Sequence, residues 1–176
     1  MDDQPIRDAI THQFDAAFAM LRAAIEQCPP QVWTQAADGP AGGRIAYHTL
    51  HYTDAYLCDG WDAHQQAAWA HEHAYLFKRE GSWPPESAEI PDVIYDAEQL
   101  LAYGDEVKQT ARDVVASKDL SDASAFAHIK GTRLAVHVYN LRHLQHHVGQ
   151  LCLLTRRAGG GVVGWSGNGE APRKPG

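Results

Sequence analysis

The sequence predicts an all-α protein in which four long helices form a four-helix bundle, with a long crossover connection between the second and third helices. Four segments repeat apolar residues at steps of three and four, the spacing that places them on one face of an α-helix. No segment shows the strict alternation of apolar and polar residues that is typical of half-buried strands. The chain has 176 residues and is 44% hydrophobic, which suits one domain with its own core.

The first two helices are predicted from their apolar stripes and their stop signals. The first covers about residues 5–28 and ends before Pro29-Pro30, since proline lacks the backbone donor that continues a helix. Residues 31–43 contain several turn-forming glycines and are predicted to be a loop. The second helix covers about residues 44–58 and is followed by a stop signal at Gly60.

Residues 61–89 are predicted to be a long, largely irregular connection with a short helical piece around residues 62–74. The segment 61–83 is rich in tryptophan and other aromatic residues. These aromatic side chains could form the apolar wall of a pocket, and plain packing explains them equally well.

The third and fourth helices complete the predicted bundle. The third covers residues 91–117, because Pro91 suits the first helical position. The fourth covers residues 132–157 and ends at a run of three glycines, 159–161. We therefore predict one domain over residues 1–165 and a flexible C-terminal tail over residues 166–176.

Composition excludes several classes of partner. The formal net charge is −7, and no run of Lys or Arg stands out, so we expect no nucleic-acid binding and no binding to anionic membranes. We find no apolar stretch of the ~20 residues needed to span a bilayer and no signal peptide. The three cysteines lie far apart and form no CxxC pair. These features predict a cytoplasmic protein with reduced thiols.

Histidine is the unusual residue of this chain, with eleven copies that do not form a terminal tag. His143 and His147 are four residues apart on the fourth predicted helix, so their rings lie one turn apart and within ~40° around the axis. Two imidazoles at this spacing can bind one metal ion. The pair is a weak motif alone, because it also occurs in polar stripes. Its position in the interior of an apolar helix favours a metal site, since buried ring nitrogens need partners.

The second predicted helix offers a third imidazole. Either His48 or His51 could face the axis of the bundle. Three protein ligands that leave open coordination positions are typical of a reactive metal site rather than a closed structural one. On the fourth helix, His146 is displaced by ~60° from His143 and is less suited to share the ion. Six histidines are interpreted as ordinary surface or structural residues: His12, His64, His71, His73, His128 and His137.

The fourth helix resembles a known family in the run His143-Leu-Gln-His146-His147-Val-Gly149-Gln150. The DinB/YfiT-like superfamily of metal-dependent enzymes has an H-x-x-x-H pair on its last helix, often ending in His-His-x-Gly-Gln. In that family, another histidine comes from the second helix.

The second helix carries the other matching motif. Ala46-Tyr47-His48 followed by Asp54 is similar to the family's second-helix segment. The resemblance therefore implies that His48, rather than His51, is the third metal ligand beside the pair on the last helix. It covers most of the chain, but only these two helices carry specific motifs.

The resemblance implies a metal-dependent enzyme acting on a small-molecule substrate, either a thiol S-transferase or a hydrolase. The ion would be Zn²⁺ or Ni²⁺ held by His48, His143 and His147, with a low-molecular-weight thiol as a possible co-substrate. The alternatives are a non-catalytic metal-binding bundle that forms a homodimer and a bundle whose histidines bind no metal. His51 or Asp54 could contact a ligand histidine. Gln150 could orient a ligand, although packing against another helix is the favoured interpretation.

Overall fold

The computed structural model describes residues 3–35, 39–77, 90–167 and 169–172. These residues form five α-helices and one 3₁₀-helix, and none of them belongs to a strand, so the predicted all-α class is confirmed. The helices, listed in chain order, are α1 (Gln4–Glu26), α2 (Pro30–Thr34), α3 (Gly42–Ala55), η1 (Trp61–Ala63), α4 (Ala97–Ser117) and α5 (Arg133–Arg157).

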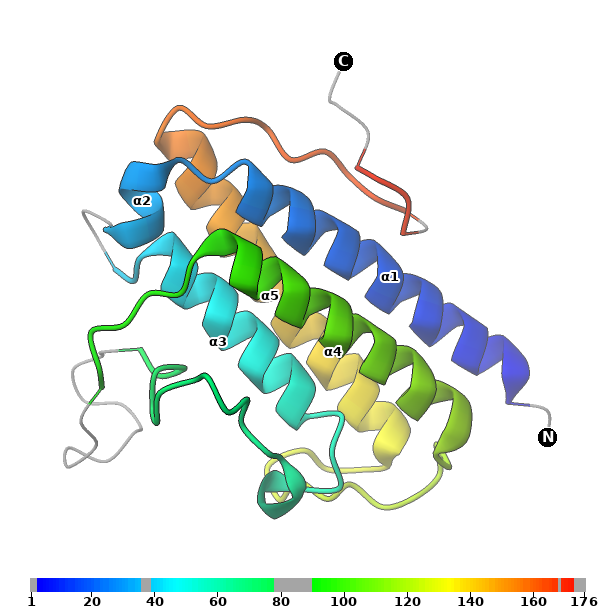
Figure 1. The fold of residues 1–176 in the computed structure, drawn as a ribbon. Coiled ribbons are helices and arrows are strands. Elements are labelled where there is room, and N and C mark those ends of the chain that lie inside the picture. The colour runs from blue at the N-terminus through cyan, green and yellow to red at the C-terminus, as the bar shows by residue number, and fades with distance from the viewer. Residues whose placement is uncertain (1–2, 36–38, 78–89, 168, 173–176) are drawn as a thin grey trace.

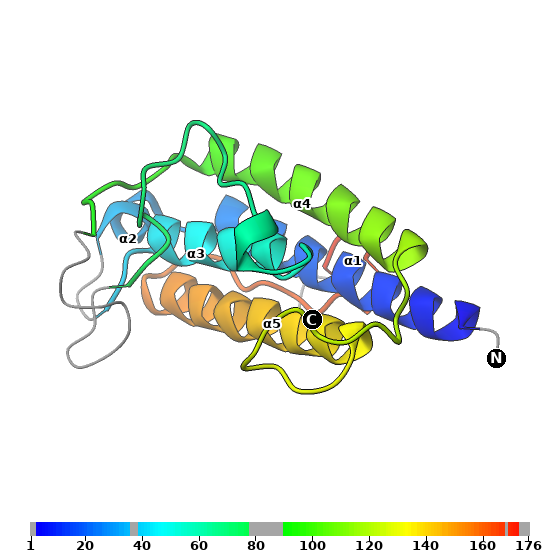
Figure 2. The ribbon, with the colours of Figure 1, turned by 90° about the horizontal axis from the view of Figure 1, so that it is seen from below.

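The long helices of the described chain, α1, α3, α4 and α5, lie alongside one another (Figures 1 and 2). Helix α1 packs against α4 and α5, and α3 packs against the same two helices on the opposite side. Helices α1 and α5 run in one direction and α3 and α4 in the other. The segment 56–96 must therefore carry the chain from the end of α3 back to the level at which α3 begins.

The core lies where the apolar stripes of these helices meet. Leu50 of α3, Leu100 of α4 and Leu144 and Leu151 of α5 have no exposed surface. Each fully buried leucine side chain contributes about 1.5–3 kcal/mol through removal of apolar surface from water. The periodic apolar residues therefore both define the helices and hold them together.

The start of α4 differs from the prediction. Residues 91–95 are not helical, and α4 begins at Ala97 after Asp96, whose carboxylate accepts a hydrogen bond from the backbone N–H of Gln99 at 3.0 Å. The preceding residues use their carbonyl groups elsewhere, because the carbonyl of Tyr95 accepts from the indole N–H of Trp33 at 3.0 Å. The pattern Asp96-x-x-Gln99 is the helix-start signal, and the prediction had placed the start at Pro91 instead.

The predicted loop over residues 31–43 was also wrong in part. Residues 30–34 form α2, and Gly42 and Gly43 form the first turn of α3; residues 36–38 lie outside the described chain. A Cβ atom on Gly43 would lie 2.5 Å from the side chain of Ile94. The glycine therefore allows α3 to pack closely against the connection that precedes α4.

Arg44 fixes the connection between α3 and α4. Its buried guanidinium donates to the carbonyl groups of Ala74 at 3.0 Å and Leu76 at 3.4 Å on one side of the undescribed residues 78–89. It also donates to the carbonyl groups of Pro91 and Val93 on the other side. Within the described part of residues 62–74, the predicted helical piece is reduced to the end of η1. Trp83, in the aromatic-rich segment, lies outside the described residues.

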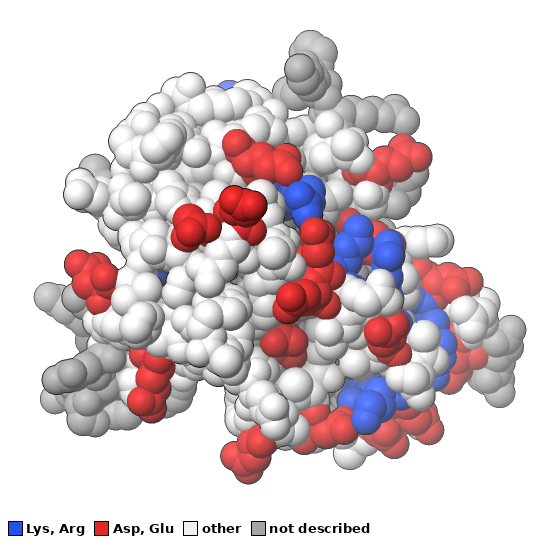
Figure 3. All heavy atoms as spheres, viewed as in Figure 1, with Lys and Arg blue, Asp and Glu red and all other residues white. Residues whose placement is uncertain are grey.

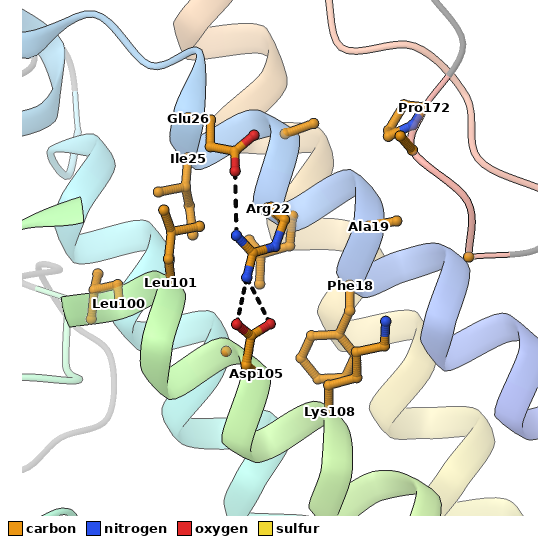
Figure 4. A pocket seen from close by; sticks show the side chains of 15 residues that line it. Phe18, Ala19, Arg22, Ile25, Glu26, Leu100, Leu101, Asp105, Lys108 and Pro172 are labelled. Carbon is orange, nitrogen blue, oxygen red and sulfur yellow. Dashed lines mark hydrogen bonds and ion pairs between the residues drawn. The ribbon is translucent and has the colours of Figure 1, made fainter. Parts of the chain in front are cut away.

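Ion pairs join α1 to α4 on the outside of the molecule. Arg22 donates to both carboxylate oxygens of Asp105, at 2.7 and 2.6 Å, and to Glu26 at 3.3 Å (Figure 4). Arg112 makes a two-point contact with Asp15, at 2.9 and 3.0 Å. On the face shown in Figure 3, Lys and Arg accordingly lie among Asp and Glu side chains.

The described part of the C-terminal segment returns along α1. The hydroxyl of Ser166 accepts from the N–H of Gly169 at 3.2 Å and donates to the carbonyl of Glu170 at 2.8 Å. Residues 169, 171 and 172 help to line a small cavity of about 220 Å³ between α1 and α4 (Figure 4). The flexibility of this tail stays a prediction. Among the described helices, none combines the length and apolar character that crossing a bilayer requires.

Candidate metal centre

Three histidines meet where α3 packs against α5. His48 lies on α3, and His143 and His147 lie on consecutive turns of α5. Each offers one ring nitrogen, and these nitrogens all lie within 4.8 Å of one another. The two helices run antiparallel and in contact, so residues from the middle of α3 reach the later turns of α5. The histidine cluster, defined here as His48, His143 and His147, could hold a metal ion.

Hydrogen bonds at the outer nitrogens orient two of these rings. His48 Nδ1 lies 2.7 Å from the carbonyl oxygen of Tyr75. A carbonyl can only accept, so Nδ1 must carry the proton, and the neutral ring then has its lone pair on Nε2. His147 Nδ1 lies 2.7 Å from Oε1 of Gln150, which fixes the same tautomer. Both rings therefore present an Nε2 lone pair, the form that binds a metal ion.

Gln150 was predicted to pack against another helix, and that interpretation was wrong. Its side-chain oxygen accepts from His147, while its nitrogen lies 3.2 Å from Nε2 of His146. Residues three and four apart on a helix are neighbours, so one glutamine reaches both imidazoles. The sequence contained this signal in the i, i+3 spacing of His147 and Gln150.

Burial keeps His48 and His143 uncharged at neutral pH. Loss of solvent, followed by the nearby His147 and His146, lowers the pKa of His143 to about 3. The pKa of His48 is lowered for the same first reason, burial, and by His147. A neutral imidazole has a lone pair to share, whereas a protonated one cannot bind a cation. Nε2 of His143 and Nε2 of His147 lie 3.1 Å apart.

The donor set passes a simple test of fit for a divalent transition metal. Three neutral imidazole nitrogens converge within a few ångströms, and imidazole suits Zn²⁺, Ni²⁺ and related ions. Nδ1 of His143 is buried without a hydrogen-bond partner in the described structure. Ring nitrogens that point at one another, next to a nitrogen that has no partner, are energetically unfavourable when no ion is bound between them. The residues therefore fit the ion, although metal binding itself stays a prediction.

Aromatic side chains surround the cluster. Phe77, from the connection, stacks on His48 with ring centroids 4.0 Å apart and an interplanar angle of 17°. Tyr52 lies with its ring 4.7 Å from that of His48 and 5.5 Å from that of His143. These rings keep bulk water away from part of the cluster, which strengthens electrostatic interactions inside it.

His51, the other candidate from α3, lies apart from the cluster. Its ring stacks on Tyr75 at 3.8 Å and an angle of 3°, and it meets His64 edge-to-face at 4.8 Å. Asp54, predicted as a possible contact of a ligand histidine, instead accepts from the hydroxyl of Tyr103 at 2.8 Å and contacts Nε2 of His64 at 3.3 Å.

Sequence reasoning assigned His64 to the ordinary surface or structural residues and did not predict its contact with Asp54. The His64 side chain is 9% exposed, and its Nε2 lies 3.3 Å from a carboxylate oxygen of Asp54. No local pattern indicates this pairing, because His64 follows α3 in the connection and is turned back onto the helix. Only the fold brings the two residues together.

The remaining histidines of α5 are not part of the cluster: His146 contacts the ring of His147 from the exposed side of the helix, and His137 lies in the core. His137 is 1% exposed and packs edge-on against Phe14 of α1 at 6.3 Å. Neither of its ring nitrogens has a hydrogen-bond partner in the described structure. Burial, followed by the charges of Arg133 and Arg7, lowers its pKa to about 4. His137 is therefore a neutral core residue.

Comparisons of the chain with protein-family models, with curated proteins and with solved structures found no match. Membership of the DinB/YfiT-like superfamily thus stays a prediction that rests on the motifs of two helices. What the structure adds is the geometry of an all-helical chain that could hold one metal ion among His48, His143 and His147.

Proposed function

We propose that this chain is a metal-dependent enzyme of the DinB/YfiT-like type, a thiol S-transferase or hydrolase that acts on a small molecule. Its ion would be Zn²⁺ or Ni²⁺, held by His48, His143 and His147. The observation that carries the proposal is the convergence of the three rings: one nitrogen each of His48, His143 and His147 lies within 4.8 Å of the others, while the carbonyl of Tyr75 and the amide oxygen of Gln150 orient His48 and His147 through Nδ1.

The fold supports the same proposal. The antiparallel contact of α3 with α5 brings together the residues that the family motifs designate. The parallel course of α3 and α4 is what a four-helix bundle with a crossover connection requires (Figure 1). The DinB-like bundle is accordingly part of the proposal.

Three neutral imidazoles leave the full positive charge on a bound divalent ion, which then lowers the pKa of a bound water or thiol towards neutrality. The chain's own residues do the rest. The Gln150 side chain orients the ring of His147, and the Tyr75 carbonyl orients the ring of His48. Phe77 excludes water from one side of His48. With only three protein ligands, positions remain for a substrate or a thiol.

Metal content and stability of untagged protein test the site. We expect close to one ion per chain in the wild type and none in His48→Ala or His143→Ala. The matched control is His146→Ala, an exposed histidine on the same helix that lies outside the cluster, and it should retain the ion. At a hundredfold excess of ion over Kd, metal should stabilise the wild type by about 2.7 kcal/mol.

Thiol-transfer and hydrolysis assays of the loaded protein then test the activity. A loaded protein with metal-dependent stability, no turnover and a dimeric state would replace the enzyme by the non-catalytic bundle. Absence of metal even after incubation with Zn²⁺ or Ni²⁺, or equal metal content in wild type and His143→Ala, would contradict the site itself.

A further inference from the structure

A cavity of about 830 Å³ lies beside α3, and part of its wall comes from the aromatic-rich segment 61–83. Its lining includes the rings of Tyr52, Tyr56, Trp61 and Tyr75, which come from α3, η1 and the connection. This volume falls within the range of small-molecule sites, which is roughly 300–1,000 Å³. Trp61 is 46% exposed, an unusual position for a large aromatic side chain unless it forms the rim of a site.

The rings of this cavity, which we call the aromatic pocket, meet at steep angles. Trp61 is perpendicular to Tyr52, at 6.0 Å and 89°, and lies 5.3 Å from Tyr56 at 57°. Tyr75 is also nearly perpendicular to Tyr52, at 5.6 Å and 84°. Neighbouring walls of the pocket therefore present both the faces and the edges of aromatic rings. A flat aromatic ligand can stack on one wall and contact another wall edge-on.

The aromatic pocket has no fixed charge in its described lining. Besides the four aromatic rings it contains three histidines and Gln66, and none of its lining residues is Lys, Arg, Asp or Glu. Asp54 contacts the lining residue His64 at 3.3 Å and is also engaged by the hydroxyl of Tyr103. An anionic ligand would lose its hydration without gaining a countercharge, so the lining disfavours anions.

His51 is a polar residue of the pocket whose ring has a fixed position. The ring is held on both sides, by stacking on Tyr75 and by the edge of His64. His51 is 6% exposed, and its Nδ1 is enclosed without a hydrogen-bond partner in the described structure, so Nε2 is the ring nitrogen that a ligand could reach. A ring nitrogen held in place at the wall of a pocket is a suitable partner for a hydroxyl group on a ligand.

We propose that the aromatic pocket is a binding site for neutral, planar aromatic compounds that carry a hydroxyl group, the phenol class. Stacking against Tyr52, Tyr56, Trp61 and Tyr75 supplies the affinity. A hydrogen bond to the ring of His51 orients the hydroxyl.

The aromatic pocket adjoins the histidine cluster, which gives the ligand a role. The Tyr52 ring lines the pocket and also contacts His48 and His143. Tyr75 lines the pocket with its ring while its carbonyl orients His48. As the substrate class of the proposed enzyme, this assignment rests on the proposed function; as a binding site, it can be tested without the metal.

The test uses four probes of similar size and different character. These are 2-naphthol, 2-naphthoate, (2-naphthylmethyl)trimethylammonium and decahydro-2-naphthol, titrated by calorimetry and by tryptophan fluorescence into metal-free and metal-loaded protein. We expect 2-naphthol to bind about tenfold or more tightly than each of the others. The naphthoate carries an unpaired negative charge, the saturated probe lacks a planar ring, and the ammonium probe lacks the hydroxyl group that bonds His51. Its affinity should be similar with and without the metal.

Variants locate the site. Trp61→Ala should weaken 2-naphthol binding about two- to tenfold, the range for loss of one aromatic contact, and Trp61→Phe should restore most of it. His51→Phe keeps a ring on Tyr75 and should also weaken binding, because the hydrogen bond is lost. The control is Trp165→Ala, which removes a 71% exposed tryptophan outside the pocket lining. Thermal melts of each variant confirm that it is folded.

Several results would overturn the assignment. These are equal binding of the naphthoate or the ammonium probe, equal binding of the saturated probe, equal effects of Trp61→Ala and Trp165→Ala, and binding that disappears when the metal is removed. The two proposals fail separately. A chain that binds no metal but selects 2-naphthol retains the pocket, and a loaded chain without this selectivity retains the metal site.

Discussion

Polar side chains find different partners on two faces of this molecule, the face between α1 and α4 and the face between α3 and α5. Between α1 and α4, charged side chains are paired with opposite charges, as in the two-point contacts of Arg22 with Asp105 and of Arg112 with Asp15. Between α3 and α5, the polar groups are histidines that burial keeps neutral, as the lowered pKa of His143 shows. The charges of the first face are paired within the chain, whereas the second face contains a buried ring nitrogen, Nδ1 of His143, that has no hydrogen-bond partner in the described structure.

This difference indicates where a ligand acts. Ion pairs on an exposed helix face contribute little individually, with a typical value of about 0–1 kcal/mol. Buried groups without partners reduce the stability of the protein that contains them, so they persist where they serve another purpose. Measurements that change one face and leave the other intact test this difference.

Acid should produce the largest effect, and it should act through the histidine face. Burial lowers the pKa of His51 to about 3, while the unfolded chain titrates near 6.5. Between these values the unfolded state binds more protons, so stability is full above about pH 6.5 and falls as the pH decreases. Each such histidine should remove about 1.4 kcal/mol per pH unit in that window. Urea unfolding of metal-free protein from pH 7 to pH 4 measures this slope.

Two variants test whether the buried histidines cause this loss of stability in acid. His51→Phe keeps a ring stacked on Tyr75. It should reduce the dependence of unfolding free energy on pH by roughly the contribution of one histidine. His12→Gln, an exposed change on α1, should leave the slope as it is, because that side chain meets water in both states. Equal slopes in wild type and His51→Phe would contradict the electrostatic account of this face.

The next largest effect should be on metal affinity, when the hydrogen bond that orients His147 is removed and the histidine itself is kept. Gln150→Leu deletes the acceptor that fixes the tautomer of His147. Loss of such an orienting partner reduces metal affinity by roughly 10–100-fold, which a competition titration with a chromophoric chelator measures. Gln145→Leu, another glutamine on α5 that contacts Met20 instead, is the control. Similar affinities of Gln150→Leu and wild type would show that the hydrogen bond does not tune the site.

The smallest effect should come from the paired face. Asp15→Asn removes the charge that contacts Arg112, whose side chain is 43% exposed and can therefore be hydrated. We expect a loss of about 1 kcal/mol of unfolding free energy, smaller in 1 M salt because screening weakens the original pair. Metal content should be unchanged. A parallel loss of metal and stability would show that the two faces are coupled, contrary to the comparison.

The sequence predicted the parts of the fold that depend on local periodicity. The apolar stripes placed all four long helices, and the i, i+4 spacing placed His143 beside His147. The start of α4 was predicted six residues too early, 91 instead of 97, because a proline signal was weighed above the Asp96-x-x-Gln99 cap. The all-α class followed from patterns that each helix carries by itself.

The parts that depend on distant contacts could not be read in the same way. Periodicity left His48 and His51 as alternatives, because the face of α3 that meets α5 is set by packing between helices. The family resemblance selected His48, and the fold places that ring in the cluster. Composition suggested a pocket wall in segment 61–83, and Trp61 and Tyr75 of that segment do line the aromatic pocket. The partners of these rings on α3 and the contact of His64 with Asp54 were not predicted, since the path of the connection after α3 has no periodic signal.

The guanidinium of Arg44 joins carbonyl groups on both sides of the undescribed residues 78–89. It therefore closes the chain between Leu76 and Pro91 into a loop whose two ends are held by one buried side chain. Lengthening a loop that is closed in this way costs little, because each doubling in length adds only about 0.6 kcal/mol of closure entropy. An affinity tag inserted between these two ends would thus carry a small entropic cost for the fold.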